Sequence, residues 1–224
     1  GTTQFIDTYQ DGDSRLEDSW LMGQQFDAEG NPLYGAYDKK GELLIFSKEL
    51  PDGNYTNEME GYRYNKQEVP AGSEWSCSTD IPLLRYSEVL LMKAECLLRT
   101  NQSGAGELVT EVRKRAFKAD PSKATVTDDE LKENSSYQWG VVENYQITDR
   151  GNQDPIEFGR LFDERCWEFV WEGYTRRDMI RFGIFCKKSW LSHKPQGDHR
   201  IVFPIPQRAV DANPKLTQNP DYAN

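Results

Sequence analysis

The spacing of apolar residues divides the chain into two parts. From residue 1 to 80 the apolar runs are short and lie between turn signals such as Asp52-Gly53-Asn54 and Glu60-Gly61. This pattern is typical of loops and short strands, and Leu43-Leu44-Ile45-Phe46 is a predicted strand. From residue 81 to 224 apolar residues recur mainly at helical spacing. We therefore expect a loop-rich segment over 1–80 and a helical region over 81–224.

The helical region opens with a predicted pair of helices. Thr79-Asp80 is a capping signal and Pro82 follows near the first helical turn. Apolar residues then recur at positions 83, 84, 90, 91, 94, 97 and 98. This period predicts a helix over about 82–99, and a similar period predicts a second over about 105–118. Because the connector is short, the two helices should pack antiparallel, with Leu91 in their interface.

A third long helix is predicted from Asp154 to about Glu172. Asp154-Pro155-Ile156-Glu157 combines an N-cap, a proline at the first position and a glutamate at the third. The expected core stripe consists of Phe158, Phe162, Cys166, Phe169 and Val170. Short helices are predicted to open at Thr127 and at Thr175, and residues 133–153 are predicted as loop.

Composition and charge narrow the classes of function. Hydrophobic residues make up only 37% of the 224 residues, but 10 Phe, 6 Trp and 11 Tyr argue against disorder. The net charge of −10 repels phosphate backbones and anionic headgroups, so nucleic acid is not an expected partner. No apolar run reaches the length of a membrane span, so no membrane-spanning helix is expected.

Metal and cofactor sites are not expected either. The four cysteines form no CxxC pair, and Cys96 and Cys166 fall on apolar stripes where a free cysteine is usually a small core residue. Asp11-Gly12-Asp13 lacks the spacing of a calcium loop and is interpreted as a polar turn. No nucleotide-binding, zinc-protease or serine-hydrolase motif occurs.

The acidic residues of the third helix raise the question of catalysis. Asp163 with Glu164, or a stripe formed by Glu164, Glu168 and Glu172, could be imagined as a glycosidase pair. We interpret them instead as a solvated helix face with local ion pairs. His193 and His199 lie in a Lys-, Pro- and Gly-bearing loop, where they are expected to be exposed and without an orienting partner. The chain is therefore not expected to be an enzyme.

Three segments, in order, resemble the SusD/RagB family of outer-membrane nutrient-binding lipoproteins. They are DIPLLRYSEVLLMKAE at 80–95 with VRKRA at 112–116, LFDERCWEFVWEGY at 161–174 with its continuation to 183, and FPIPQ at 203–207 with NPKLTQNPDY at 213–222. The resemblance covers residues 55–224. It implies a mainly α fold with long loops and short strands, corresponding to the C-terminal half of a SusD-like fold that contains tetratricopeptide repeats.

The resemblance also implies a function. It indicates non-catalytic binding of an oligosaccharide or polysaccharide at the cell surface, for delivery to a SusC-like TonB-dependent transporter. Membrane contact is expected only through an N-terminal lipid that this chain does not contain. The alternative is a RagB-like peptide-binding protein, which the resemblance permits equally at the level of the fold. A glycoside hydrolase is the less favoured third class.

Aromatic residues of the loop-rich segment are the candidate ligand contacts. Sugar rings stack on aromatic faces while their hydroxyls need polar side chains nearby. The candidates, which follow no helical or strand period, are Trp20, Tyr34, Tyr37, Tyr62 and Trp75, with Trp75 and Trp20 favoured. The expected polar rim consists of Gln24, Gln25, Asn31, Asn57 and Arg63. In contrast, Trp167, Trp171 and Tyr174 are predicted to pack in the core.

Overall fold

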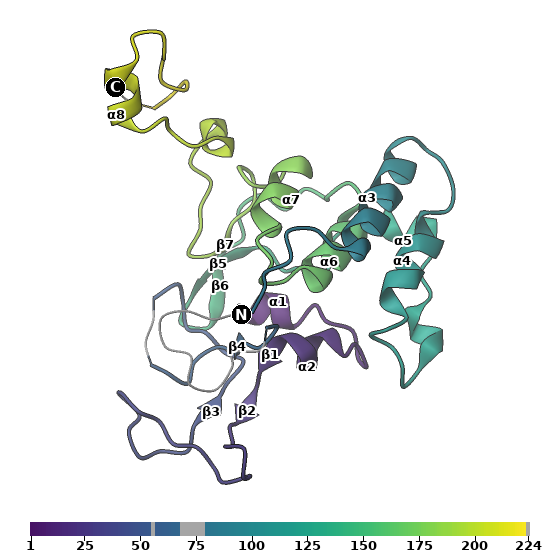
Figure 1. Cartoon of the computed structure of the whole chain (residues 1–224), viewed down its shortest axis with the longest axis vertical. Coiled ribbons are helices and arrows are strands. Elements are labelled where there is room, and N and C mark those ends of the chain that lie inside the picture. The colour runs from purple at the N-terminus through teal and green to yellow at the C-terminus, as the bar shows by residue number, and fades with distance from the viewer. Residues whose placement is uncertain (55–56, 68–78, 223–224) are drawn as a thin grey trace.

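The structure is a computed structural model that describes residues 1–54, 57–67 and 79–222. Figure 1 shows a helical body from which two segments extend in opposite directions. We call residues 23–46, which bear β2 and β3, the loop arm, and residues 198–222, which bear α8, the tail. Within the described residues no helix is long and apolar enough to cross a membrane. The elements are α1 (Thr3–Ile6), α2 (Arg15–Ser19), β1 (Trp20–Leu21), β2 (Gly23–Gln24), β3 (Ile45–Phe46), β4 (Arg63–Tyr64), α3 (Tyr86–Arg99), α4 (Ala105–Arg113), η1 (Pro121–Ala124), α5 (Asp128–Leu131), β5 (Gly140–Glu143), β6 (Gln146–Asp149), α6 (Gly159–Glu168), α7 (Thr175–Arg181), β7 (Trp190–Leu191), η2 (Asp198–Ile201) and α8 (Gln207–Ala212).

The predicted mainly helical fold with short strands is confirmed, and α3 and α4 form the expected hairpin. Leu91 of α3, Val109 of α4 and Leu161 of α6 are fully buried in one apolar cluster. α5 closes this cluster with Leu131, and the short helix predicted to open at Thr127 begins there with a capping box. The helical period of the sequence therefore located the main core correctly.

The first long helix begins at Tyr86 and not near Pro82. Leu83, which was predicted to face the core, is 90% exposed in the segment that precedes the helix. Two long-range contacts hold this segment in place: the Tyr174 hydroxyl donates to the Leu83 carbonyl at 2.7 Å, and Arg85 forms an ion pair with Glu172 at 2.8 Å. Both contacts depend on distant residues, so the capping signal at Thr79-Asp80 did not locate the start of the helix.

The third long helix begins at Gly159, five residues after the predicted cap at Asp154. At this point the chain crosses residues 134–135 so closely that a Cβ on Gly159 would lie 2.2 Å from the Ser135 nitrogen. The preceding Phe158 adopts a left-handed conformation with φ 57°. The Asn134 side chain accepts the Ile156 N–H at 2.9 Å, a bond that replaces helical hydrogen bonding there.

Residues 133–153, predicted as loop, contain two strands of a three-stranded sheet with the order β6-β5-β7. β5 pairs antiparallel with β6 and parallel with β7. Asn144 and Tyr145 form the turn between β5 and β6 with positive φ angles of 49° and 65°. Such a turn usually carries glycine, and its absence from this turn removed the sequence signal for a hairpin.

The cysteines only partly follow their prediction. Cys96 is exposed on α3 and is not a core residue, whereas Cys166 is half-buried beside Trp139 and Phe162. Burial raises the pKa of the Cys166 thiol. The acidic turn at 11–13 is an ion-paired turn, in which Asp11 binds Lys123 and Asp13 binds Arg15.

Candidate ligand-binding site

Two of the predicted aromatic residues lie at the end of the loop arm. β2 and β3 pair antiparallel at its base, and isolated bridges join Tyr34 to Leu43 and Gly35 to Lys40 further out. A Cβ on Gly35 would lie 2.4 Å from the Lys39 carbonyl oxygen, so only glycine permits this close approach. The backbone N–H of Tyr37 donates to Glu58 at 3.0 Å, which connects the tip to the segment at 57–60.

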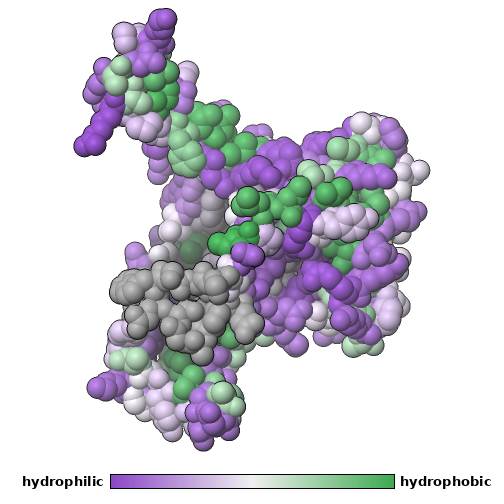
Figure 2. All heavy atoms as spheres, viewed as in Figure 1, coloured by the Kyte–Doolittle hydropathy of each residue, from purple (hydrophilic) through white to green (hydrophobic). Residues whose placement is uncertain are grey.

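The rings of Tyr34 and Tyr37 are open to solvent. Tyr34 is 56% exposed and Tyr37 is 80% exposed. Other apolar side chains of the same arm are also exposed, namely Phe26, Leu33, Leu43 and Ile45. The arm therefore exposes aromatic and apolar side chains among hydrophilic neighbours (Figure 2).

The predicted polar rim has a different role, because four of its five residues use side-chain donors within the fold and the fifth, Asn57, accepts the Met59 N–H at 2.9 Å. Gln24 and Gln25 donate to backbone carbonyls of the arm, at 2.8 Å from Gln24 Nε2 to the Gln25 oxygen. Asn31 donates at 3.0 Å to an aspartate of its own turn. The Arg63 guanidinium donates to the Glu58 carbonyl at 2.6 Å. These contacts stabilise the loops and leave those donors occupied.

Trp20 does not form an open platform, which corrects its prediction. Its ring is 4% exposed and belongs to an apolar cluster with Ile6 and Val170. The indole N–H donates to the Tyr9 hydroxyl at 3.2 Å, and the ring centroid lies 5.2 Å from that of Trp171. Trp20 therefore belongs to the core that joins β1 to the end of α6.

The remaining predicted aromatics have other environments. Tyr62 is half-buried against the Trp20 cluster, so it is a less open candidate than Tyr37. Trp75 lies outside the described residues, and its role stays a prediction. Trp167 and Tyr174 are buried as expected, whereas Trp171 is half exposed.

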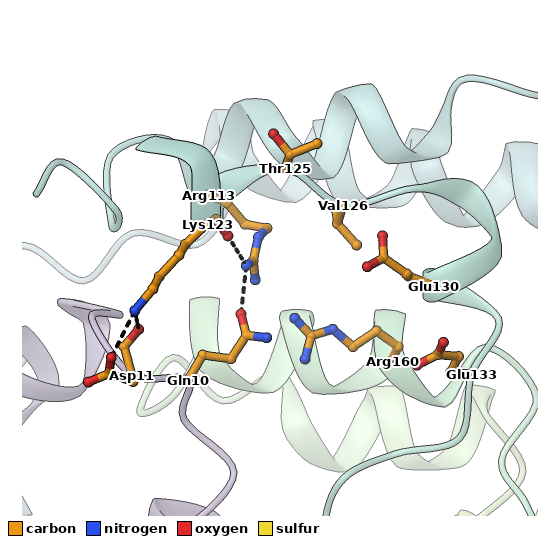
Figure 3. A pocket seen from close by; sticks show the side chains of 9 residues that line it. All are labelled: Gln10, Asp11, Arg113, Lys123, Thr125, Val126, Glu130, Glu133 and Arg160. Carbon is orange, nitrogen blue, oxygen red and sulfur yellow. Dashed lines mark hydrogen bonds and ion pairs between the residues drawn. The ribbon is translucent and has the colours of Figure 1, made fainter. Parts of the chain in front are cut away.

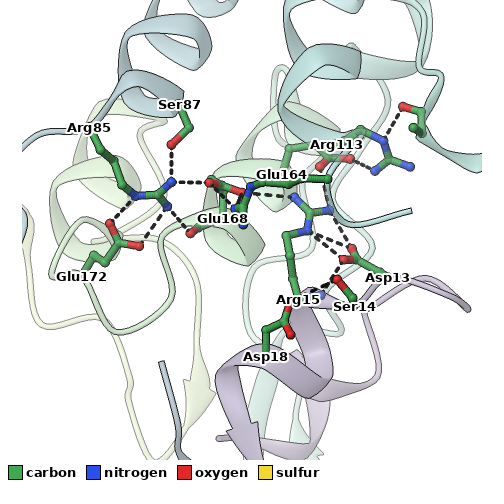
Figure 4. A network of polar contacts seen from close by, with 12 residues as sticks. Asp13, Ser14, Arg15, Asp18, Arg85, Ser87, Arg113, Glu164, Glu168 and Glu172 are labelled. Atoms are coloured by element: carbon green, nitrogen blue, oxygen red, sulfur yellow. Dashed lines mark hydrogen bonds and ion pairs between the residues drawn. The ribbon is translucent and has the colours of Figure 1, made fainter. Parts of the chain in front are cut away.

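The acidic stripe formed by Glu164 and Glu168 of α6 and by Glu172 beyond it has buried, ion-paired side chains, which corrects the interpretation of a solvated face (Figure 4). Glu164 accepts from Arg15 at 3.1 Å and also pairs with Arg113. Arg85 joins Glu168 to Glu172. Since every buried carboxylate here has arginine partners, the stripe connects α6 to the elements around it.

No glycosidase pair results from this arrangement. Burial by itself would raise the pKa of Glu168, but Arg115 and Arg85 hold that pKa below its ordinary value. Burial raises the pKa of Asp163, whose carboxylate accepts from Ser135 and Ser136 at 2.5 and 2.8 Å. Because Asp163 is only 3% exposed, a substrate has no access to it.

A charged cavity of about 490 Å³ lies above α6 (Figure 3). Arg113 and Arg160 point into it, and Gln10 accepts from Arg113 at 2.7 Å. Lys123 at its edge is already paired with Asp11 at 2.8 Å. Aromatic residues are absent from the described lining, so the cavity offers no stacking surface for a sugar ring.

A second cavity, of about 190 Å³, is mainly aromatic and was missed by sequence reasoning. Tyr137, Trp139 and Trp190 line it together with Phe162 and Cys166. Burial raises the pKa of Tyr137 to about 12. The alternating apolar residues of 137–141 were the available signal, but the segment was predicted as loop. The cavity is the most apolar hollow described and remains a secondary candidate.

Both histidines were expected to be exposed, but the structure shows them half-buried. His193 stacks on Trp190 with ring centroids 3.7 Å apart, and His199 meets Tyr222 edge to face at 4.9 Å. Burial lowers the pKa of His193. Their aromatic contacts give both residues a packing role.

Comparison with curated proteins identifies distant relatives. The chain is 27% identical over 167 residues to the starch-binding protein SusD of Bacteroides thetaiotaomicron, covering 71% of this chain and 24% of that protein. It is 25% identical over 185 residues to a SusD-like protein of Formosa agariphila, covering 82% of this chain and 32% of that protein. The chain thus spans about a quarter to a third of the length of these relatives.

Solved structures show the same fold. NanU of Bacteroides fragilis matches with a TM-score of 0.59 at 21% identity, covering 100% of this chain and 39% of that chain. A SusD superfamily protein of Bacteroides vulgatus matches with a TM-score of 0.60 at 20% identity, covering 100% of this chain and 40% of that chain. The fold is therefore a portion of the SusD-like fold.

The family assignment rests on nearly the whole chain. Residues 1–222 match the model described as SusD family, so the match extends through the first 55 residues that the sequence resemblance had left unspecific. SusD family proteins are non-catalytic binding proteins, in agreement with the prediction that this chain is not an enzyme. From the match over residues 1–222, the chain belongs to the SusD family.

Proposed function

We propose that this chain is part of a cell-surface protein that captures an oligosaccharide or polysaccharide, and that the loop arm contacts the glycan. The observation that carries the proposal is the exposure of Tyr34 and Tyr37, which belong to the loops beyond the β2–β3 pair of the projecting arm. Starch binding by one distant relative supports a glycan as the ligand class. Within the segment 1–80, proposed as the ligand-binding surface, the arm offers the most open aromatic rings described.

The affinity expected from such a surface is modest. Burying about 100 Å² of apolar surface contributes about 2–3 kcal/mol at roughly 25 cal/mol per Å². One tyrosine platform is therefore worth a roughly 30- to 100-fold change in Kd. Weak binding of this kind suits a protein that must release its cargo.

The proposal also covers the delivery of the glycan and the cellular location of the protein. The captured glycan is passed to a SusC-like TonB-dependent transporter, and the full-length protein is held at the outer membrane by an N-terminal lipid. The support for both statements is membership of the SusD family. Neither step requires a cofactor or the making or breaking of a bond in the ligand.

The experiment measures glycan binding by a glycan array, followed by calorimetry with the best ligand. Tyr37→Ala should weaken Kd by roughly 30- to 100-fold, because it removes an exposed stacking face. Tyr86→Ala is the matched control, since Tyr86 is equally a surface tyrosine but lies on α3. If the two variants bind like the parent protein, the arm is not the platform.

A peptide library run beside the glycan array tests the alternative. A RagB-like peptide binder would give hits in the library and none on the array. A glycan binder gives the opposite result. Binding of peptides alone would overturn the proposed ligand class without affecting the family assignment.

A further inference from the structure

A groove of about 240 Å³ lies between the body and the tail, at the end of the molecule opposite the arm. α7 and the segment that follows it form one wall through Arg176, Phe185 and His193. The tail forms the other wall through Arg200, Phe203 and Tyr222. We call these six residues the tail groove. Its volume suits one sugar ring better than a large ligand.

The arginines of the tail groove differ from most arginines of the chain. Those of the buried networks, such as Arg15, Arg113 and Arg165, are all paired with carboxylates. Within the described residues, Arg176 and Arg200 form no ion pair, although the chain carries a net charge of −10. Two uncompensated cations facing one groove in an acidic protein are suited to bind an anion.

Packing holds the Arg176 guanidinium in place. Its Cζ lies over the rings of Phe185 and Phe203, at 4.9 and 4.4 Å from their centroids. Its Nη2 donates to the carbonyls of Arg200 and Ile201 at 2.8 and 3.2 Å. The described residues accept no hydrogen bond from its Nε and Nη1. A stacked guanidinium with unused donors is preorganised for a carboxylate.

The surroundings favour a ligand with a ring as well as a charge. Phe203 is 70% exposed and offers an aromatic face, and Gln196 in the lining offers an amide to hydroxyl groups. Asp198 lies near enough to raise the pKa of the Cys186 thiol, an effect smaller than that of burial and opposed by Arg176. Asp198 does not line the groove, so the lining carries no carboxylate among the residues that the structure describes.

We propose that the tail groove binds an acidic sugar residue through Arg200 and Arg176, so that the protein prefers uronate-containing glycans. The inference rests on the proposed glycan-binding function and adds a substrate class to it. The carboxylate of the sugar pairs with the two guanidinium groups while its ring lies against Phe203. The arm contributes stacking that does not depend on charge.

The test is calorimetry with oligomers of galacturonate, glucuronate, mannuronate and guluronate, each compared with its neutral methyl ester. At least one acid form should bind at least about tenfold more tightly than its ester, as charge-assisted hydrogen bonds predict. The preference should shrink when salt is raised from low to high ionic strength. If none of the four acid forms binds, or if the esters bind as tightly, the proposal is overturned.

Arg200→Gln should abolish the preference for the acid form and leave the thermal midpoint unchanged, because Arg200 is exposed and contributes only its backbone to the Arg176 contact. Arg208→Gln is the matched control, since Arg208 on α8 is an exposed arginine that does not line the groove. An unchanged preference in Arg200→Gln would contradict the assignment.

The two proposals can fail separately. Loss of acid-form binding in Arg200→Gln while Tyr37→Ala binds normally would support the groove and contradict the arm. Normal acid-form binding by Arg200→Gln with weakened binding by Tyr37→Ala would support the arm and contradict the groove.

Discussion

Burial separates aromatic residues that look alike in the sequence. Trp20 and Tyr37 both lie in the loop-rich segment among polar neighbours. Trp20 is surrounded by Phe5, Tyr9 and Trp171, whereas Tyr37 projects from the end of the arm. Only the second ring is accessible from solvent, and the first contributes to stability.

Trp20→Ala should therefore destabilise the protein. Loss of a buried tryptophan costs about 3–5 kcal/mol, since it leaves a cavity that its neighbours fill only in part. Thermal unfolding followed by circular dichroism should show a midpoint lower by on the order of 10 °C. Tyr37→Ala serves as the control and should melt like the parent protein. An unchanged midpoint in Trp20→Ala would place its ring outside the core.

At the scale of elements, the α3–α4 hairpin and α6 share one apolar cluster, while the segment before α3 lies outside it. Leu91 and Leu83 are both leucines of the first predicted helix. Leu91 is fully buried and Leu83 is 90% exposed, because the helix begins only at Tyr86. The two positions therefore form a natural pair for testing where the core ends.

Leu91→Ala should cost about 2–5 kcal/mol of unfolding free energy, as for other buried leucines. Leu83→Ala should change that free energy by less than about 0.5 kcal/mol, because the exposed Leu83 side chain buries little apolar surface in the folded chain. Urea unfolding of both variants measures the difference. Equal losses at the two positions would mean that the segment before α3 packs in the core.

For the whole molecule, buried ion pairs connect segments that are far apart in the chain. Arg15 of α2, Arg85 before α3 and Arg115 after α4 all contact Glu168 of α6. Breaking such a network leaves uncompensated buried charges, which costs more than the intact pairs contribute. The acidic stripe of α6 thus holds the fold together and has no catalytic role.

Glu168→Gln should lower stability at pH 7 by about 3–5 kcal/mol. Because the folded pKa of Glu168 lies below its ordinary value of 4.5, the ionised form stabilises the folded chain above pH 4.5. That stabilisation is lost as pH falls through the folded pKa. The difference between the parent and the variant should therefore shrink on acidification, as measured by urea unfolding at pH 7 and below pH 4.5. A difference that is independent of pH would contradict this role.

The sequence correctly predicted features that depend on local period. It predicted the α3–α4 hairpin with Leu91 in its interface, a short helix opening at Thr127, the buried face of α6 and the resemblance to the SusD family. Helical spacing is a property of neighbouring residues, and the core face follows from it directly. Tyr34 and Tyr37 were ligand candidates by their lack of any period, but so was the buried Trp20.

Features that depend on distant partners became visible only in the folded chain. The close crossing at Gly159 shortened α6, and remote arginines allowed Glu164 and Glu168 to be buried. Trp20 became a core residue through contacts with Tyr9 and Trp171. Residues without a period can be buried or exposed depending on what the rest of the chain places against them, so local pattern could not separate Trp20 from Tyr37.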